Sequence, residues 1–197
     1  MNDRTRAASL AAAALAIALA SSTDRGRSLD ARAFHRLNAG GSASADLVFG
    51  AFTELGSIWA SAGAAAALAA AGRRREAAPA LGAAGATWAL GQACKRVFMR
   101  PRPYDAFGAE VSRLLIRKPR GTSWPSSHPA VLVSFLTVAA RELGLDSAAR
   151  AGMLALAGTV GASRIHLGVH FPSDVVGGLL LGRAVGLVWP SQWRSGR

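Results

Sequence analysis

Residues 148–190 read AARAGMLALAGTVGASRIHLGVHFPSDVVGGLLLGRAVGLVWP, which places a short polar segment between two apolar ones. The apolar segments, 148–162 and 173–190, approach the length of about 20 residues that a helix needs to cross a bilayer. Residues 163–174 between them concentrate Ser, Arg, His and Asp. The pattern predicts two membrane helices joined by a connection whose polar side chains carry chemistry.

Four more apolar segments extend this pattern toward the N-terminus: 6–22, 47–72, 77–94 and 129–140. The last of these is short unless the preceding turn is also helical. We therefore expect an all-α integral membrane bundle of about six transmembrane helices, forming a single domain over residues 1–197. A cleaved signal peptide is the alternative for the first segment, because Arg4 and Arg6 precede its apolar part.

The composition agrees with a membrane protein. Of the 197 residues, 51% are hydrophobic and only 17% are charged, and the net charge is +12. An excess of positive charge suits an anionic partner at a membrane surface. Nucleic acid is not expected as a partner, because aromatic residues are few and no nucleic-acid motif is present. Cys94 is the single cysteine, which excludes an internal disulfide and argues against a structural zinc site.

Glycine recurs at every fourth position in the last apolar segment, at Gly178, Gly182 and Gly186. Residues with this spacing share one face of a helix, and small side chains allow helices in lipid to pack closely. We expect this face to be a packing seam against a neighbouring helix.

Two polar connections are expected to meet on one membrane face, because two predicted spans lie between them. The first runs from Lys95 to His128; it starts KRVFMRPRP at 95–103 and ends with WPSSHP at 124–129. The second is SRIHLGVHFPSD at 163–174. Taken singly, their Lys and Arg residues would be interfacial anchors, but their convergence favours one site.

The cations and serines of these connections suit a phosphoryl group. Lys95, Arg102 and Arg164 could surround its oxygens, since guanidinium groups offer forked donors that match phosphate geometry. Ser126 and Ser127 stand just before a predicted helix, where free backbone N–H groups point toward an anion. Phosphoryl transfer depends mainly on such positioning and charge stabilisation.

Turnover requires a nucleophile and an acid, and the two connections supply a histidine for each role. His170 could attack phosphorus to give a phosphohistidine, while His128 protonates the departing alkoxide. Asp174, four residues after His170, could reach back and fix the imidazole tautomer if a helix starts near Pro172. The two protonation states predict a bell-shaped pH profile.

These motifs resemble the three-part signature of the type 2 phosphatidic acid phosphatase (PAP2) superfamily, whose pocket is shared with vanadium-dependent haloperoxidases. That signature is Lys, six residues, Arg-Pro; then Pro-Ser-Gly-His; then Ser-Arg, five residues, His, three residues, Asp. The chain matches these spacings with the following residues: Lys95, Arg102, Pro103, Pro125, Ser126, His128, Ser163, Arg164, His170 and Asp174. One position departs from it, since Ser127 stands where the family usually has Gly.

The resemblance implies a role for each matched residue. Lys95, Arg102 and Arg164 would bind phosphate together with Ser126 and the backbone at Ser127. His128 would be the general acid, His170 the nucleophile and Asp174 its orienting partner. It also implies chemistry without metal or cofactor. A side chain at Ser127 could clash if the loop needs a positive φ there.

The expected activity is hydrolysis of a phosphomonoester or pyrophosphate on an amphiphilic substrate in the membrane. Substrate candidates are polyprenyl-linked phosphates, phosphatidic acid and phosphatidylglycerophosphate, with a polyprenyl-linked substrate of cell-envelope synthesis favoured. One rival is a non-catalytic membrane protein that binds or transports anionic lipid, for which His170 and Asp174 would have no purpose. A vanadate-dependent haloperoxidase is the other.

The side of the cell membrane on which the site lies has conflicting signals. Thirteen Lys and Arg residues fall on the predicted catalytic side and nine on the other, which by charge alone favours the cytoplasm. Three of the thirteen are needed for phosphate, however, and the family resemblance favours the outer face. The sequence does not indicate an oligomeric state.

Overall fold

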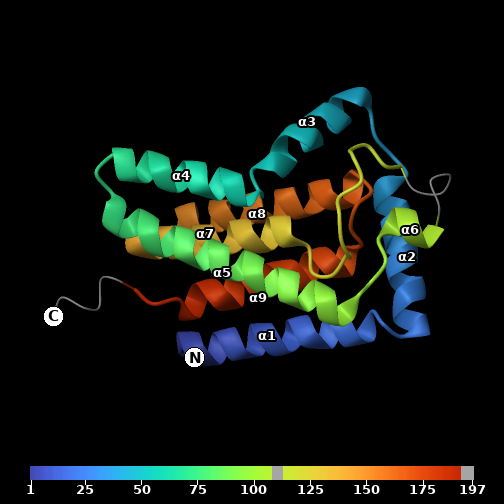
Figure 1. Cartoon of the computed structure of the whole chain (residues 1–197), viewed down its shortest axis with the longest axis horizontal. Helices are drawn as coiled ribbons and strands as arrows, with labels where there is room; N and C mark the ends of the chain where they lie inside the picture. Colours follow the sequence, from blue (N-terminus) through green and yellow to red (C-terminus); the bar gives the residue numbers. More distant parts are fainter. Residues whose placement is uncertain (108–112, 192–197) are drawn as a thin grey trace.

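The computed structural model describes residues 1–107 and 113–191, and within these ranges the regular structure is helical. The helices are α1 (Asp3–Ala20), α2 (Asp24–Asn38), α3 (Ala43–Glu54), α4 (Ile58–Ala70), α5 (Arg74–Phe98), α6 (Pro103–Phe107), α7 (Ser127–Glu142), α8 (Ser147–His166) and α9 (Pro172–Val188). Helices α1, α4, α5, α7, α8 and α9 lie roughly side by side, whereas α2 runs across them at one end, beside the short α6 (Figure 1). The expected all-α bundle is confirmed.

Short polar side chains fix where most of the helices begin. The residues before α1, α2, α3, α4 and α8 each accept a hydrogen bond from the backbone N–H three residues further on. These caps are Asn2, Thr23, Ser42, Ser57 and Asp146. Each satisfies a backbone donor that would otherwise lack an intrahelical partner, so local sequence sets these boundaries.

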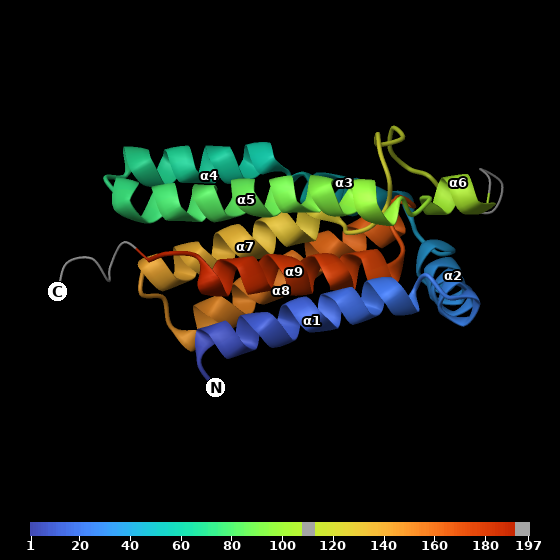
Figure 2. The same cartoon turned by 60° about the horizontal axis from the view of Figure 1, so that its bottom comes forward.

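Helix α7 forms the centre of the bundle, with α5, α8 and α9 packed around it (Figures 1 and 2). One core cluster joins alanines of α5 to the large side chains Val131, Phe135 and Val138 of α7. Because the α5 side of this contact is mostly methyl groups, the two helices can pack closely. Helix α1 lies along α9 on the outside.

The glycine face of α9 packs against the backbone of α7, as the sequence predicted. A Cβ added at Gly178 would lie 2.4 Å from the carbonyl oxygen of Ser126, and one at Gly182 would lie 2.1 Å from that of Ala130. Any side chain at either position would therefore push α9 away from α7. Close approach here also holds the N-terminus of α7 beside the start of α9.

The prediction of one continuous helix over 47–72 is wrong, because the chain breaks between α3 and α4. A Cβ added at Gly56 would lie 2.7 Å from the Cβ of His128 and 2.7 Å from a Cγ of Val160. Ser57 then caps α4. At the break, the backbone of Gly56 therefore packs directly against His128 of α7 and Val160 of α8.

The other predicted segments correspond to α1, α5, α7, α8 and α9, with shifted ends. Helix α8 continues to His166, so Ser163 and Arg164 lie in its last turns rather than in a connection. By length and apolarity, no single helix among the described residues meets the criteria for a membrane span. The pair α1 and α2 would meet them together but bends by 97°.

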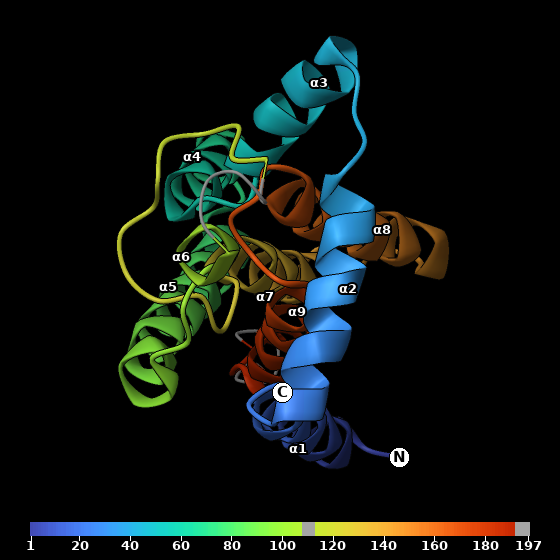
Figure 3. The ribbon, with the colours of Figure 1, turned by 90° about the vertical axis from the view of Figure 1, so that its right-hand side faces the viewer.

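All the predicted motifs lie at one end of the bundle. This end combines the C-termini of α5 and α8 with the N-termini of α7 and α9. Seen end-on, α2 runs across the ends of α8 and α9 (Figure 3), and it contacts both. The two polar connections therefore meet on one face, as their spacing predicted.

Candidate active site

His170 lies in the connection between α8 and α9 and is only 2% exposed. Its Nδ1 is 3.5 Å from Oδ2 of Asp174, which is longer than an ordinary hydrogen bond. Ser123 lies between them: its hydroxyl is 3.4 Å from the same Nδ1 and donates to Oδ2 of Asp174 at 2.5 Å. The predicted pair is therefore present, with a serine hydroxyl linking the ring to the carboxylate.

The position of Asp174 follows from local sequence. Pro172 occupies the start of α9, and Asp174 in the first turn accepts the backbone N–H of Phe171 at 2.8 Å. Proline suits a first helical position, and a carboxylate there satisfies a free N–H and complements the helix dipole. The turn therefore presents the carboxylate toward His170, as expected from the four-residue spacing.

Arg102 contacts the other nitrogen of the same imidazole. Its Nη1 lies 3.2 Å from Nε2 of His170 and also donates to the carbonyl oxygen of Val169 at 2.9 Å. Its Nε donates to the carbonyl oxygen of Gly121, also at 2.9 Å. A guanidinium has no acceptor, so Nε2 must offer its lone pair and the ring proton belongs on Nδ1. This is the tautomer that a nucleophilic Nε2 requires.

Lys95 stands at the end of α5 and is held by the connection that follows. Its Nζ donates to the carbonyl oxygen of Thr122, and the Thr122 hydroxyl donates to the carbonyl oxygen of Lys95, both at 2.8 Å. This reciprocal pair ties residue 122 to the last turn of α5. It thereby positions the neighbouring Ser123 as well.

The predicted phosphate-binding residues hold buried polar atoms that lack partners. Among the described residues, Ser126 Oγ, Ser127 Oγ and Arg164 Nε make no hydrogen bond. Arg164 does use Nη1 to donate to the hydroxyl of Thr53 at 2.7 Å. Buried polar groups are normally paired, so these atoms fit an anion with several acceptor oxygens.

Ser127 is the first residue of α7 and has no positive φ, so the expected clash at this position does not arise. The backbone N–H groups of the first turn of α7 are available to an anion, as in other helix N-termini. The side chain in place of the family's Gly is therefore accommodated without backbone strain.

The charges of the site act strongly on one another. Burial, followed by Arg102 and Arg164, lowers the pKa of Lys95 to about 7. Burial, followed by Arg164, Lys95 and Arg102, lowers the pKa of His128 to about 3. Burial and the same cations hold the pKa of His170 well below its usual value, and His128 adds to this effect. The three cations and two imidazoles therefore belong to one cluster.

Sequence reasoning missed the cation that pairs with Asp174. Arg100 Nη1 lies 2.8 Å from Oδ1 of Asp174, while its Nη2 lies 2.6 Å from Oδ2 of Asp30 on α2. Asp30 also accepts the backbone N–H and the hydroxyl of Ser173, at 3.0 and 2.5 Å. A buried carboxylate requires such partners, but no spacing in the sequence shows which arginine supplies them.

We expect Arg100→Gln to lower the free energy of unfolding by about 3–5 kcal/mol, because it leaves Asp30 and the buried Asp174 without their shared cation. Unfolding of the purified variant in detergent would measure this loss. Arg36→Gln, which removes an exposed arginine from α2, is the control. Equal stability of the two variants would contradict the structural role of Arg100.

His166 does not belong to the site, although it lies four residues before His170. Its Nε2 is 2.8 Å from Oδ1 of Asp46 on α3, and Arg113 binds the other oxygen of that carboxylate at 2.6 Å. This cluster ties α3 to the end of α8. Among the described residues, no group of three or more His, Cys, Asp or Glu side chains is placed to hold a metal ion.

Comparison with known proteins gives matches at the level of family and fold. Residues 76–196 match the family model of the PAP2 superfamily. A decaprenylphosphoryl-5-phosphoribose phosphatase of Mycobacterium tuberculosis is 33% identical over 117 residues, which cover 59% of this chain. The match spans 60% of the length of that relative.

Two solved structures resemble this fold, one of them over nearly the whole chain. A transmembrane PAP2-type phosphatidylglycerolphosphate phosphatase from Bacillus subtilis superposes with a TM-score of 0.80 at 22% identity, covering 98% of each chain. LpxE of Aquifex aeolicus superposes with a TM-score of 0.69 at 29% identity, covering 79% of this chain and 90% of its own.

Proposed function

This chain belongs to the PAP2 superfamily, and on that basis we propose that it is a membrane phosphatase that hydrolyses a phosphomonoester or pyrophosphate of an amphiphilic lipid through a phosphohistidine. The observation that carries the proposal is the environment of His170. One ring nitrogen faces Ser123 and Asp174, and the other faces Arg102 within a cationic cluster. A lipid binder or transporter needs the cations but not an oriented imidazole.

In the proposed complex, the phosphate oxygens accept hydrogen bonds from the cationic side chains and the start of α7. Arg102 exchanges its contact with Nε2 of His170 for a phosphate oxygen. The partnerless atoms of Ser126 and Arg164 then gain acceptors. These groups stabilise the charge on the transferring phosphoryl group without forming a bond to it.

The first chemical step transfers the phosphoryl group to the protein. Nε2 of His170 forms a bond to phosphorus as the bond to the leaving oxygen breaks, and protonated His128 gives its proton to that oxygen. Asp174, through Ser123, stabilises the positive charge that develops on the ring. The products of this step are the dephosphorylated lipid and phosphohistidine.

The second step returns the histidine to its starting state. A water molecule attacks phosphorus opposite Nε2 and gives a proton to His128, which is neutral after the first step. The bond between phosphorus and Nε2 breaks and inorganic phosphate leaves. His128 then gives its proton to the solvent, because its pKa falls again in the empty site. His128 thus serves as acid and then as base.

Substrate binding explains how His128 acquires its proton. Burial and the neighbouring cations hold its pKa at about 3 in the free site. An incoming phosphate dianion offsets those positive charges and raises the pKa of the imidazole beside it. The acid is therefore formed only when substrate is bound.

We expect kcat/KM to fall as pH rises through about 7, because Lys95 has a pKa of about 7 in the free site and binds phosphate in its charged form. Lys95→Arg should remove this basic limb even where it lowers the absolute rate, since arginine stays protonated. The measurement is kcat/KM against pH for both proteins on the same substrate. The ionisation of the substrate affects both profiles equally, so a difference between them comes from the protein. An identical basic limb in the variant would exclude Lys95 as its source.

The lipid class rests on the named relatives. One is a decaprenylphosphoryl-5-phosphoribose phosphatase, and a structural neighbour is a phosphatidylglycerolphosphate phosphatase. We favour a polyprenyl-linked phosphate, in agreement with the relative of higher identity. Phosphate release by the purified protein, with chelator present, from polyprenyl-linked phosphates, phosphatidylglycerophosphate, phosphatidic acid and their pyrophosphate analogues would rank the candidates. Release from none of them would refute the proposed function.

We propose that the site lies on the outer face of the cell membrane, which the family resemblance favours. Intact cells that produce the protein should then release phosphate from an added water-soluble phosphomonoester that does not cross membranes. Release only after lysis would place the site in the cytoplasm.

A further inference from the structure

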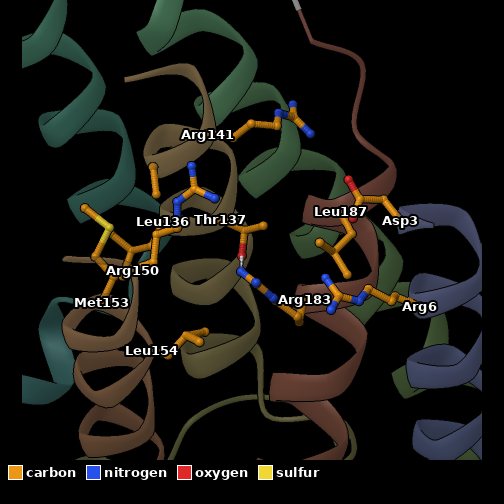
Figure 4. Close-up of a pocket in the computed structure, with 11 residues that line it drawn as sticks. Asp3, Arg6, Leu136, Thr137, Arg141, Arg150, Met153, Leu154, Arg183 and Leu187 are labelled. Atoms are coloured by element: carbon orange, nitrogen blue, oxygen red, sulfur yellow. Dashed lines mark hydrogen bonds between the residues drawn. The ribbon is translucent and has the colours of Figure 1, made fainter. Parts of the chain in front are cut away.

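A second concentration of positive charge lies at the end of the bundle opposite the candidate active site. It surrounds a cavity of about 150 Å³ between α1, α7, α8 and α9 (Figure 4). Four arginines line the cavity: Arg6, Arg141, Arg150 and Arg183. Among the described residues that line it, Asp3 is the only acid, so the cavity has an excess of positive charge.

The guanidinium groups of this cavity are only partly paired. Arg183 donates to the hydroxyl of Thr137 at 2.7 Å, and Arg141 binds Glu142 at 3.0 Å. Arg141 Nη2 is nevertheless buried without a partner within residues 1–107 and 113–191. In the same part of the chain, the side chains of Arg6 and Arg150 make no hydrogen bond or ion pair. Unused forked donors aimed around one cavity fit the oxygens of a phosphate group.

Apart from Asp3 and Thr137, the rest of the lining is apolar and comes from α7, α8 and α9. Leu136 of α7, Leu154 of α8 and Leu187 of α9 stand beside the arginines (Figure 4). Aliphatic side chains offer no favourable contact to a small inorganic anion. A lipid, in contrast, presents a charged head group and a hydrocarbon chain side by side. The lining therefore matches an amphiphilic anion.

We propose that this cavity binds the phosphate group of an acidic membrane lipid, in the leaflet opposite the candidate active site. Basic pockets between membrane helices are suited to such head groups. The 16 residues of α7, which run from one site to the other, span about 24 Å, so this lipid is not the substrate in its catalytic position. The site holds α1 against α7, α8 and α9 through a shared anion.

The test compares lipids and variants in the full-length protein. After removal of bound lipid in detergent, native mass spectrometry would count phosphatidylglycerol and phosphatidylcholine of equal chain length on each protein. Phosphatidylglycerol is a phosphodiester and is thus a poor mimic of a phosphomonoester substrate. Arg6→Gln/Arg150→Gln removes two exposed, unpaired guanidiniums, while Arg74→Gln/Arg75→Gln removes the same charge from the exposed start of α5 at the same end of the bundle.

We expect the wild-type protein to bind one phosphatidylglycerol in preference to phosphatidylcholine. The Arg6/Arg150 variant should bind phosphatidylglycerol at least about tenfold more weakly. The Arg74/Arg75 variant should bind as wild type does, and both variants should unfold at temperatures near that of wild type. Equal binding by the two variants would overturn the proposal. If inorganic phosphate displaced the lipid and the protein bound phosphatidylglycerol no better than phosphatidylcholine, the cavity would be a site for a soluble anion. That result would overturn the lipid assignment.

Discussion

His170→Ala should lower phosphate release from a lipid phosphomonoester by about 10⁴-fold or more, the scale on which removing a nucleophile acts in other hydrolases. The expectation rests on the ring's position, with Nε2 turned toward Arg102 and Nδ1 toward Ser123 and Asp174. His170 is the imidazole of the cluster with a carboxylate beside Nδ1 to stabilise the charge that develops when Nε2 attacks. Phosphate release by the purified variant measures the effect.

His35→Gln is the matched control, because it removes an imidazole that packs on Phe107 at the same end of the molecule. It should change the rate by no more than about twofold, as expected for substitutions away from a reacting centre. Rapid quenching under alkaline conditions should trap labelled phosphate on wild-type protein and none on His170→Ala. Turnover by His170→Ala at the wild-type rate would remove the proposed mechanism.

His128→Ala should slow hydrolysis of a lipid alkyl phosphate by about 10²–10⁴-fold, the range that a positioned general acid contributes. The effect on the first turnover should shrink for nitrophenyl phosphate, because its weakly basic leaving group departs without a proton. The three cations lower the pKa of His128, and its side chain makes no hydrogen bond within the described part of the chain. The comparison of the two leaving groups therefore tests its role.

The nitrophenyl substrate also separates the two steps of the cycle. His128→Ala should release nitrophenol in a burst close to one equivalent per protein. The burst is expected because phosphohistidine forms but hydrolyses slowly without the general base. His170→Ala, which cannot form the intermediate, should show no burst with either substrate. An equal loss of the first-turnover rate on both leaving groups in His128→Ala would exclude the general-acid role.

Halide oxidation offers a separate test of the haloperoxidase alternative. Vanadate resembles phosphate in geometry and charge, so it should occupy the same cationic cluster and inhibit phosphate release. Peroxide-dependent halide oxidation by the vanadate-loaded protein would assign the chain to that branch instead.

Much of the fold was predictable from local pattern. The apolar segments depend on residues adjacent in the chain, and they correspond to helices α1, α3, α4, α5, α7, α8 and α9. The break at Gly56 was not predictable, because its cause is the approach of α7 and α8 from elsewhere in the chain. The apolar pattern did not predict the extension of α8 through Arg164, because polar residues interrupt that pattern at Ser163.

The candidate site shows the same division. Motif spacing sufficed to group the eight predicted residues, since two connections separated by two helices must emerge together. It did not reveal Ser123 and Arg100, which contact Asp174 from the connection between α5 and α7, or Asp30 of α2, which binds Arg100. Their partners are set by distances in space, and sequence separation carries no information about those distances.

By itself, the sequence determined the helical class, the membrane-like composition and the residue types of a phosphate site, because each depends on composition or short-range spacing. Only the tertiary structure decided which imidazole nitrogen faces Arg102, which arginine pairs with Asp174, and that four arginines surround a second cavity. These features depend on side chains from distant segments meeting at 2.5–3.5 Å. Tertiary packing sets these contacts, because each buried polar group must pair with a polar group that the fold places beside it.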